Sequence, residues 1–163
     1  EILRLLEEGK NLAFVTDAGT PGVSDPGNEL VAVVARQLPE VNIVPIPGAS
    51  ALTAIASIAG FPMDKFMFLG FPPAKKGRRK FFEQIAQADY PVVFYESPYR
   101  IMKSLLELQS ILNTRYKIQD TRIVVGRELT KKFETVYRGA IAEVLEQLKK
   151  GETRGEFAVV VGR

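Results

Sequence analysis

The sequence contains no cysteine, no histidine and no tryptophan among its 163 residues. Without cysteine there are no disulfides or thiol nucleophiles, and without cysteine and histidine the usual zinc sites are excluded. Histidine acid–base catalysis is excluded as well. Any chemistry must therefore use carboxylates, lysine, arginine, tyrosine, hydroxyl groups or the backbone, and we expect no metal site. The lack of cysteine also agrees with a cytoplasmic location, which we expect for this protein.

Long apolar runs are missing too. A membrane-spanning helix needs roughly 18 or more consecutive apolar residues, and the most apolar segments here, residues 11–16 and 91–95, have only the length of a strand. No secretory signal opens the chain. With 46% apolar and 25% charged residues, the composition is that of a globular domain with a real core. We therefore expect no membrane association.

Strand-like and helix-like patterns alternate along the chain, which predicts an α/β fold. The change of character at residues 61–65 places a domain boundary there, giving an incomplete first α/β domain over residues 1–64 and a second over 65–163. Two predicted strands, 122–126 and 133–138, follow each other without a helix, so the second sheet is expected to be mixed. The other predicted strands are 12–15, 41–46, 66–71, 92–95 and 157–161, and the predicted helices are 1–8, 25–38, 51–59, 78–88, 98–112 and 141–148.

Two of the predicted strands end in loops that could hold a ligand, because ligands of open α/β sheets bind beyond the carboxyl ends of strands. The first loop, residues 17–27, holds three glycines and two prolines but neither a dinucleotide fingerprint nor a P-loop. Its charged members, Asp17 and Asp25, would repel phosphate, so the loop suits a ligand with hydroxyl groups or positive charge, such as a sulfonium nucleoside. A turn with Asp25 as a helix N-cap is an equally open reading.

The second loop, residues 47–51, presents free backbone N–H groups at a helix start. An ordinary strand-to-helix turn, with Ser50 as the cap, explains it as well.

A run of cations lies just before and within the predicted helix at 78–88. Positive charge at a helix N-terminus opposes the helix dipole, and contact with nucleic-acid phosphates is one reason to keep it there. A solvated charged surface is the alternative. The run consists of Lys75, Lys76, Arg78, Arg79 and Lys80.

Carboxylates follow two later strands. Glu96 ends the strand at 92–95, and a cluster of Glu128, Thr130, Lys131 and Glu134 follows the strand at 122–126. These groups are candidates for acid–base chemistry, and a surface charge network on a hairpin is the alternative for the cluster.

Six blocks, in order along the chain, resemble a known family: Val15–Gly27, Val44–Ala51, Gly70–Pro73 with the cations after it, Phe94–Arg100, Gly126–Lys131 with Glu134-Thr135, and Gly155-Glu156. Together they are similar to the small-subunit ribosomal RNA methyltransferase I family of the tetrapyrrole methylase superfamily. One part of the family pattern is absent: the opening strand and its loop, and a later Glu-Asp-Thr-Arg block. We therefore expect an N-terminally incomplete chain that alone binds weakly or is inactive.

The resemblance implies two small α/β domains of the tetrapyrrole methylase fold, usually in a homodimer, with S-adenosylmethionine in the cleft between domains. It implies methylation of a cytidine ribose 2′-oxygen in small-subunit (16S) rRNA, with the cations at 75–80 as RNA contacts. The cofactor positions are expected at Asp17, Ala18, Gly19, Thr20, Pro21, Ser24, Asp25, Pro47, Gly48, Ser50, Ala51 and Tyr95.

The transfer itself is an in-line displacement that depends on positioning in a dry cleft. Our candidate catalytic residues are Glu96 and Glu128, as base or hydroxyl acceptor, and Lys131 as their electrostatic partner. Two other functions stay open: a methyltransferase acting on a corrin or porphyrin, which has no need of five clustered cations, and a non-enzymatic RNA-binding module that binds no cofactor.

Overall fold

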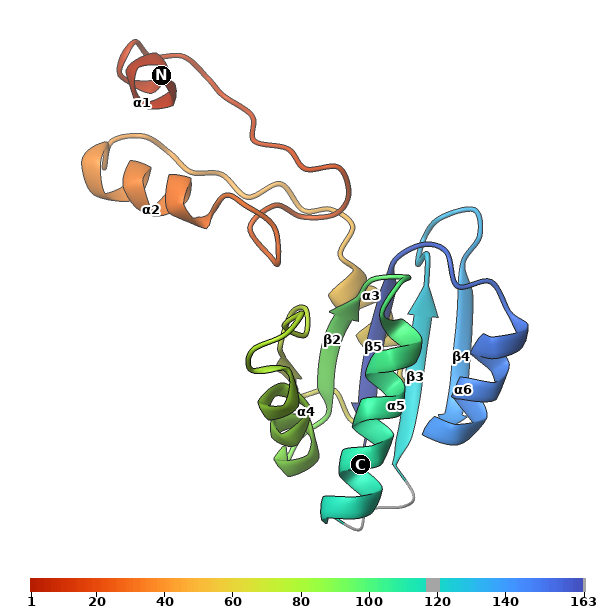
Figure 1. Ribbon diagram of the computed structural model, residues 1–163. Coiled ribbons are helices and arrows are strands. Elements are labelled where there is room, and N and C mark those ends of the chain that lie inside the picture. Colours follow the sequence, from red (N-terminus) through yellow and green to blue (C-terminus); the bar gives the residue numbers. More distant parts are fainter. Residues whose placement is uncertain (117–120, 163) are drawn as a thin grey trace. The chain divides into compact units, whose positions relative to one another are not determined.

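The computed structural model describes residues 1–116 and 121–162 (Figure 1). The chain divides into two compact units, Glu1–Ser50 and Ala51–Arg163. The division falls earlier than the expected boundary at residue 64. The reason is that the helix after Ser50 packs on the sheet of the second unit, with Ile55 fully buried there.

The first unit contains two helices, α1 (Ile2–Glu7) and α2 (Asn28–Gln37). The predicted strands at 12–15 and 41–46 are wrong, since neither segment is a strand among the described residues. A strand needs a neighbour that completes its ladder of hydrogen bonds. Among the described residues, the one backbone hydrogen bond at these segments is a local turn, from the Val41 N–H to the Leu38 carbonyl at 3.0 Å, and neither segment belongs to a sheet. Their apolar side chains stay exposed, as Val15 at 79% and Ile46 at 78% show.

The predicted N-cap of α2 is also wrong. The cap residue is Gly27 rather than Asp25, and no side chain caps the helix. Gly27 has a φ of 133°, and a Cβ there would lie 2.7 Å from the Phe14 ring. Position 27 therefore requires glycine, both for its positive φ and for its close contact with the Phe14 ring.

The second unit is built on one five-stranded sheet of order β1-β2-β5-β3-β4. Among the described strands, β1 and β2 pair in parallel and the other neighbours are antiparallel, so the predicted mixed sheet is confirmed. The strand predicted at 133–138 begins two residues later, at Thr135, because residues 128–134 form turns. The strands are β1 (Met67–Phe68), β2 (Val92–Glu96), β3 (Arg122–Arg127), β4 (Thr135–Ala140) and β5 (Phe157–Gly162).

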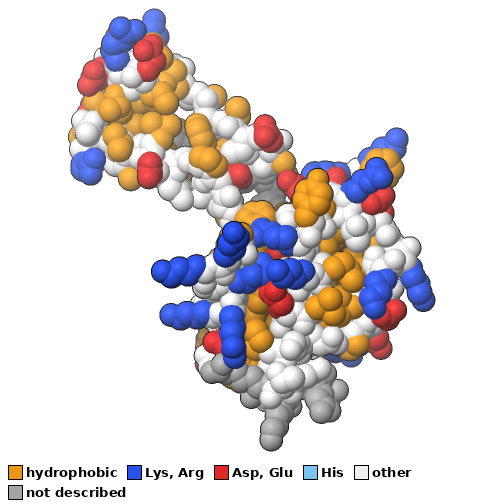
Figure 2. Space-filling view, viewed as in Figure 1, with side chains coloured by type: hydrophobic (Ala, Val, Ile, Leu, Met, Phe, Trp, Pro, Cys, Tyr) orange, Lys and Arg blue, Asp and Glu red, His pale blue; other side chains and the backbone are white. Residues whose placement is uncertain are grey.

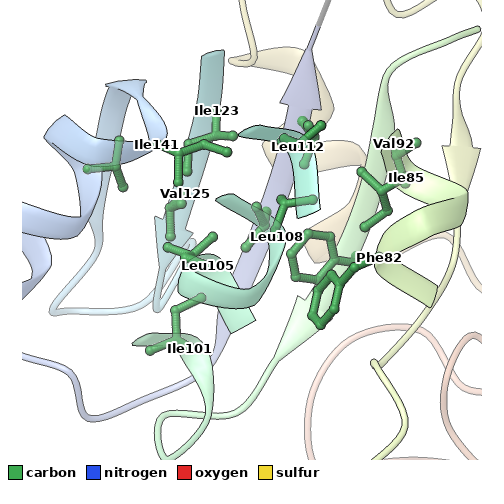
Figure 3. Packing of buried hydrophobic residues seen from close by; sticks show 14 of the residues in the cluster. Phe82, Ile85, Val92, Ile101, Leu105, Leu108, Leu112, Ile123, Val125 and Ile141 are labelled. Atoms are coloured by element: carbon green, nitrogen blue, oxygen red, sulfur yellow. The ribbon is translucent and has the colours of Figure 1, made fainter. Parts of the chain in front are cut away.

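Helices cover both faces of this sheet. On one face, α4 (Arg78–Gln87), α5 (Ile101–Ile111) and α6 (Ile141–Lys150) pack against alternate strand residues such as Val92 and Phe94 (Figures 1 and 3). On the other face, α3 (Ala51–Ser57) packs against the residues between them, such as Val93. The alternation follows from the two-residue period of a strand. After α5 the chain continues in a π-helical turn, Leu112–Tyr116.

Candidate functional site

The two predicted ligand loops of the first unit contact each other. The Thr20 hydroxyl in the first loop donates a hydrogen bond of 3.2 Å to the Ala49 carbonyl in the second. Gly19 approaches the same carbonyl closely, because a Cβ built on it would lie 3.5 Å from the oxygen. Segments 29 positions apart in the sequence therefore form one joined pair of loops.

The first loop also holds its own shape. The Thr16 hydroxyl donates to the Ala18 carbonyl at 3.0 Å, and the Asn28 side-chain amide donates to the Gly22 carbonyl at 2.9 Å. Ser24 has a φ of 61°, a left-handed conformation that is uncommon for a residue with a side chain. Such backbone strain persists where the surrounding structure fixes it, and it concentrates at functional sites.

The charges of this loop pair are acidic and accessible. Asp17 and Asp25 are exposed, and in the part of the chain that the structure describes, neither forms a side-chain hydrogen bond or an ion pair. No lysine or arginine lies between residues 17 and 27. Carboxylates without cations suit hydroxyl groups or a positively charged ligand and disfavour phosphates.

The structure brings the two loops together where Thr20 and Gly19 meet the Ala49 carbonyl. The predicted cofactor residues of the first unit lie in these two loops, and their assignment to the cofactor stays a prediction: Asp17, Ala18, Gly19, Thr20, Pro21, Ser24, Asp25, Pro47, Gly48 and Ser50. Ala51 and Tyr95 belong to the second unit, where Tyr95 packs edge-to-face on Phe68 and Phe71 with ring centroids 4.9 and 5.5 Å apart. Their assignment to the cofactor stays a prediction.

In the second unit, two predicted site segments lie at the same end of the sheet, where β2 and β3 finish. Glu96 at the end of β2 and Arg127 at the end of β3 are both register partners of Phe157 in β5. Glu96 has the same parity as Phe94 and so points into the core beneath α4 and α5, where it is 1% exposed.

The Glu96 carboxylate is fully engaged there. Its Oε1 accepts from the Ser97 backbone N–H at 2.7 Å and pairs with Arg100 Nη2 at 3.0 Å. Its Oε2 accepts from the Ser104 hydroxyl and lies 3.8 Å from Arg78 Nη1. A carboxylate enclosed in this way has no open oxygen for a substrate hydroxyl. The arrangement does not support the expected role of Glu96 as a base, and it makes Glu96 a residue that positions the segments around it.

Arg78 differs from the other cations of the basic run. Its side chain is 8% exposed and is held by Glu107 at 2.6 Å, by the Ser104 hydroxyl at 2.7 Å and by the Pro73 carbonyl at 3.2 Å. Since its guanidinium donors face the interior, the expectation that Arg78 contacts RNA is not supported. The exposed members of the run are Lys75, Lys76, Arg79 and Lys80.

The predicted cluster after β3 does form. The Glu128 Oε1 accepts from Lys131 Nζ at 3.1 Å and from the Glu156 backbone N–H at 2.8 Å. Lys131 also reaches the Glu156 carboxylate at 2.8 Å, and the Thr130 backbone N–H donates to Glu134 at 2.6 Å. This is the surface charge network that the sequence left open as an alternative.

The protonation of this cluster follows from its contacts. The hydrogen bond from the Glu156 backbone, with smaller contributions from Lys131 and Arg127, lowers the pKa of the Glu128 carboxyl against the opposing effect of burial. The Glu156 and Glu128 carboxylates raise the pKa of Lys131. Both groups are therefore charged near neutral pH, and a carboxylate with a lowered pKa is a weak general base. Glu128 suits the orientation of a hydroxyl group better than proton abstraction.

Three residues that hold the segments at this end of the sheet were not predicted from the sequence. Arg100 and Ser104 hold Glu96, and Arg127, which is 7% exposed, joins two loops by donating to the Arg154 carbonyl at 2.6 Å and the Phe133 carbonyl at 2.9 Å. The four-residue steps from Glu96 to Arg100 and from Arg100 to Ser104 were the available signal. Over residues 1–116 and 121–162, no group of three acidic residues could hold a metal ion, and no helix is long and apolar enough to cross a membrane.

Comparison with known proteins defines the class. Residues 1–145 match the family described as Tetrapyrrole (Corrin/Porphyrin) Methylases, and the chain belongs to this family. It is 40% identical over 161 residues to the Ribosomal RNA small subunit methyltransferase I of Thermotoga maritima, covering 99% of this chain and 69% of that relative.

Solved structures show the same fold. The methyltransferase CobJ superposes with a TM-score of 0.67 at 22% identity, over 99% of this chain and 68% of its own. The Uroporphyrin-III C-methyl transferase of Thermus thermophilus, solved in complex with S-adenyl homocysteine, gives a TM-score of 0.55 at 20% identity, over 89% of this chain and 63% of that one. These matches confirm the expected tetrapyrrole methylase fold.

The chain also matches other bacterial relatives that carry the name Ribosomal RNA small subunit methyltransferase I. Seven of them, at 36–41% identity, are longer proteins of which this chain spans 52% to 57%. The activity of the whole protein is therefore a matter for proposal.

Proposed function

We propose that this protein takes part in transferring a methyl group from S-adenosylmethionine to the 2′-oxygen of a cytidine in small-subunit ribosomal RNA. The observation that carries the proposal is the hydrogen bond between Thr20 and Ala49, which joins the two ligand loops. The relatives named for small-subunit rRNA methylation support the substrate, and the S-adenyl homocysteine complex of a structural neighbour supports the cofactor.

The residues of the first unit fit this cofactor by their chemistry. A sulfonium carries a positive charge, and the joined loops offer it two exposed carboxylates, Asp17 and Asp25, with no cation between them. The close approach of Gly19 to Ala49 shows that a side chain at Gly19 would point at the neighbouring loop. The backbone and hydroxyl groups at 18–21, 24 and 47–50 would hold the remaining polar atoms of the nucleoside.

The cofactor supplies an activated methyl group, whose bond to sulfur breaks as its bond to the ribose oxygen forms, leaving the neutral thioether. This chain has to orient the hydroxyl and manage its proton. Glu128, whose second carboxylate oxygen has no partner in the described part of the chain, is our candidate for accepting that hydroxyl. The hydrogen bond from the Glu156 backbone, with a smaller contribution from Lys131, lowers the pKa of Glu128 and keeps it ionised.

The RNA contact in this proposal is made by the exposed cations Lys75, Lys76, Arg79 and Lys80. Each phosphate neutralised by a lysine or arginine releases counterions, so the binding should weaken as salt rises. Figure 2 shows a group of Lys and Arg side chains projecting from the region of α4. The proposal includes the expected homodimer and cytoplasmic location, and sedimentation velocity tests the dimer.

The test is methyl transfer with labelled S-adenosylmethionine, offered small ribosomal subunits from a strain lacking the methylation and, separately, a precorrin. The proposal expects label in the rRNA and none in the tetrapyrrole. Label in the tetrapyrrole would instead establish a small-molecule methyltransferase. Salt-sensitive RNA binding without any heat of cofactor binding would establish an RNA-binding module.

A further inference from the structure

Tyr99 is an aromatic side chain that the fold does not bury. It is 95% exposed, the largest value among the exposed large hydrophobic residues that the structure describes. Its ring makes no aromatic contact and its hydroxyl no hydrogen bond in the described parts of the chain. An aromatic ring held in water in this way leaves both of its faces open to a ligand.

The backbone on both sides of Tyr99 is nevertheless fixed. Before it, the Ser97 N–H is bound to the buried Glu96 carboxylate. After it, Arg100 donates its backbone N–H to the Ser97 carbonyl at 3.1 Å and pairs with the same Glu96 oxygen at 3.0 Å. Tyr99 therefore lies in a turn between Ser97 and Arg100, both of which contact the Glu96 carboxylate. Because the turn is already ordered, a ligand binding to the ring incurs little further ordering cost.

The same buried network fixes the basic segment beside this turn. Arg100 donates to the Pro72 carbonyl at 3.2 Å, and Arg78 donates to the Pro73 carbonyl at 3.2 Å. Both arginines contact Glu96. The turn with Tyr99 and the segment with the exposed lysines are thus attached to one carboxylate from two sides.

The charges divide into an inner and an outer set. Inside, Arg78 and Arg100 are matched by the carboxylates of Glu96 and Glu107. Outside, Lys75, Lys76 and Lys80 are exposed and have no carboxylate within ion-pair distance among the described residues. Arg79 pairs with Glu83 but keeps 75% of its side chain exposed. The surface beside Tyr99 therefore carries a net positive charge.

From this combination we infer that Tyr99 and the exposed cations form one surface for single-stranded RNA, on which the Tyr99 ring stacks with an unpaired base while the cations contact the flanking phosphates. Sequence-tolerant binding of single strands combines these two elements, aromatic stacking and a positively charged track. A duplex keeps its bases inside, so it can use the cations but not the ring. The inference rests on the proposed function, because it specifies how that RNA is held.

Binding of a short fluorescein-labelled single-stranded RNA and of the matching duplex, measured by fluorescence anisotropy, tests this surface. Tyr99→Ala should weaken single-strand binding by about 5- to 150-fold, the range for loss of one stacked base. It should leave duplex binding and the salt dependence unchanged. Tyr99→Phe should bind the single strand as the wild type does, because the ring remains.

Two further variants serve as controls. Tyr90→Ala removes a half-exposed tyrosine, 47% exposed, that lies just before β2, whereas Tyr99 lies just after it. It should leave binding unchanged. The double variant Lys75→Ala, Lys76→Ala should weaken both RNAs and reduce the slope of log affinity against log salt by about 2.

The outcomes separate the inference from the proposed function. If Tyr99→Ala binds the single strand like the wild type, or Tyr99→Phe loses as much as Tyr99→Ala, the stacking surface is refuted, while salt-dependent binding by the lysines would keep the proposed RNA substrate. If the wild-type chain binds neither RNA, the stacking surface is refuted, and methyl transfer to small ribosomal subunits decides the proposed function separately. A loss confined to Tyr99→Ala and to the single strand supports both.

Discussion

Arg78 Nη1 lies 3.8 Å from Glu96 Oε2, and the two side chains are 8% and 0% exposed. This buried pair joins the start of α4 to the end of β2, and through Ser104 and Glu107 it also reaches α5. Removing one member of a buried ion pair destabilises a fold, since it leaves the other charge in the interior without its partner. The ion pair between Arg78 and Glu96 in the interior therefore holds the start of α4, and with it the exposed cations of the basic run, in place.

Arg78→Met should lower the free energy of unfolding by about 3–5 kcal/mol, because it leaves Glu96 short of one cation in the core. Arg79→Met is the matched control, since the neighbouring arginine forms only an exposed pair with Glu83. It should cost about 0–1 kcal/mol. Urea unfolding followed by circular dichroism measures both variants. Equal destabilisation of the two would contradict the burial of Arg78.

The helices of this chain could be predicted from sequence more reliably than the strands expected in its first unit, which did not form. Ile141, Val144, Leu145 and Leu148 recur with the helical period, and all four are buried in α6. Residues 12–15 and 41–46 have strand composition, but a strand is completed by a partner, which a local pattern does not contain.

The candidate site was partly predictable for a similar reason. The glycines and prolines of residues 17–27 mark a loop, and the structure shows that this loop contacts the second predicted ligand loop through Thr20 and Ala49. The interior position of Glu96 follows from its parity with Val92 and Phe94. Its partner Arg78 is separated from it by 18 positions and belongs to another element, so no spacing rule identifies the pair.

Thr20→Val should loosen the two ligand loops, because it removes the hydroxyl that donates to the Ala49 carbonyl. The expected loss is about 0.5–1.5 kcal/mol, seen as a rise of up to roughly tenfold in the dissociation constant for S-adenosylmethionine by calorimetry. Thr16→Val is the control, as its hydroxyl bonds to Ala18 within a single loop. If Thr16→Val weakens binding as much as Thr20→Val, the contact between the loops is not what holds the cofactor.

Asp17→Asn should weaken binding of S-adenosylmethionine more than binding of S-adenosylhomocysteine. The two ligands differ by a methyl group and by the positive charge on sulfur, and only the charged ligand gains from a nearby carboxylate. Asp64→Asn, an exposed aspartate of the second unit, provides the control for net charge. Calorimetric titration of both ligands gives the comparison, and an equal loss for the two would place Asp17 away from the sulfur.

The cluster of Glu128, Lys131 and Glu156 should give the stability of the chain a defined pH dependence. The pKa of Glu128 is lowered on folding, so its contribution is present above the unfolded value of about 4.3 and is lost as the pH falls through the folded pKa. The pKa of Lys131 is raised, so its contribution is present below about 10.4 and is lost as the pH rises through the folded pKa.

Urea unfolding at a series of pH values should therefore show that Glu128→Gln is less stable than the wild type near neutral pH, with the difference vanishing in acid. Glu134→Gln removes a neighbouring carboxylate that accepts a hydrogen bond from the Thr130 backbone N–H, and it controls for general loss of acidic charge. A difference between Glu128→Gln and the wild type that persists unchanged into acid would show that the carboxylate charge is not its source.

The central claim, methylation of a cytidine ribose in small-subunit rRNA, is tested most directly by alkaline hydrolysis of rRNA labelled from S-adenosylmethionine. A methyl group on the 2′-oxygen blocks attack on the adjacent phosphodiester. The account predicts label in an alkali-resistant dinucleotide that begins with cytidine. Label released in ordinary mononucleotides, or none in the rRNA at all, would contradict it.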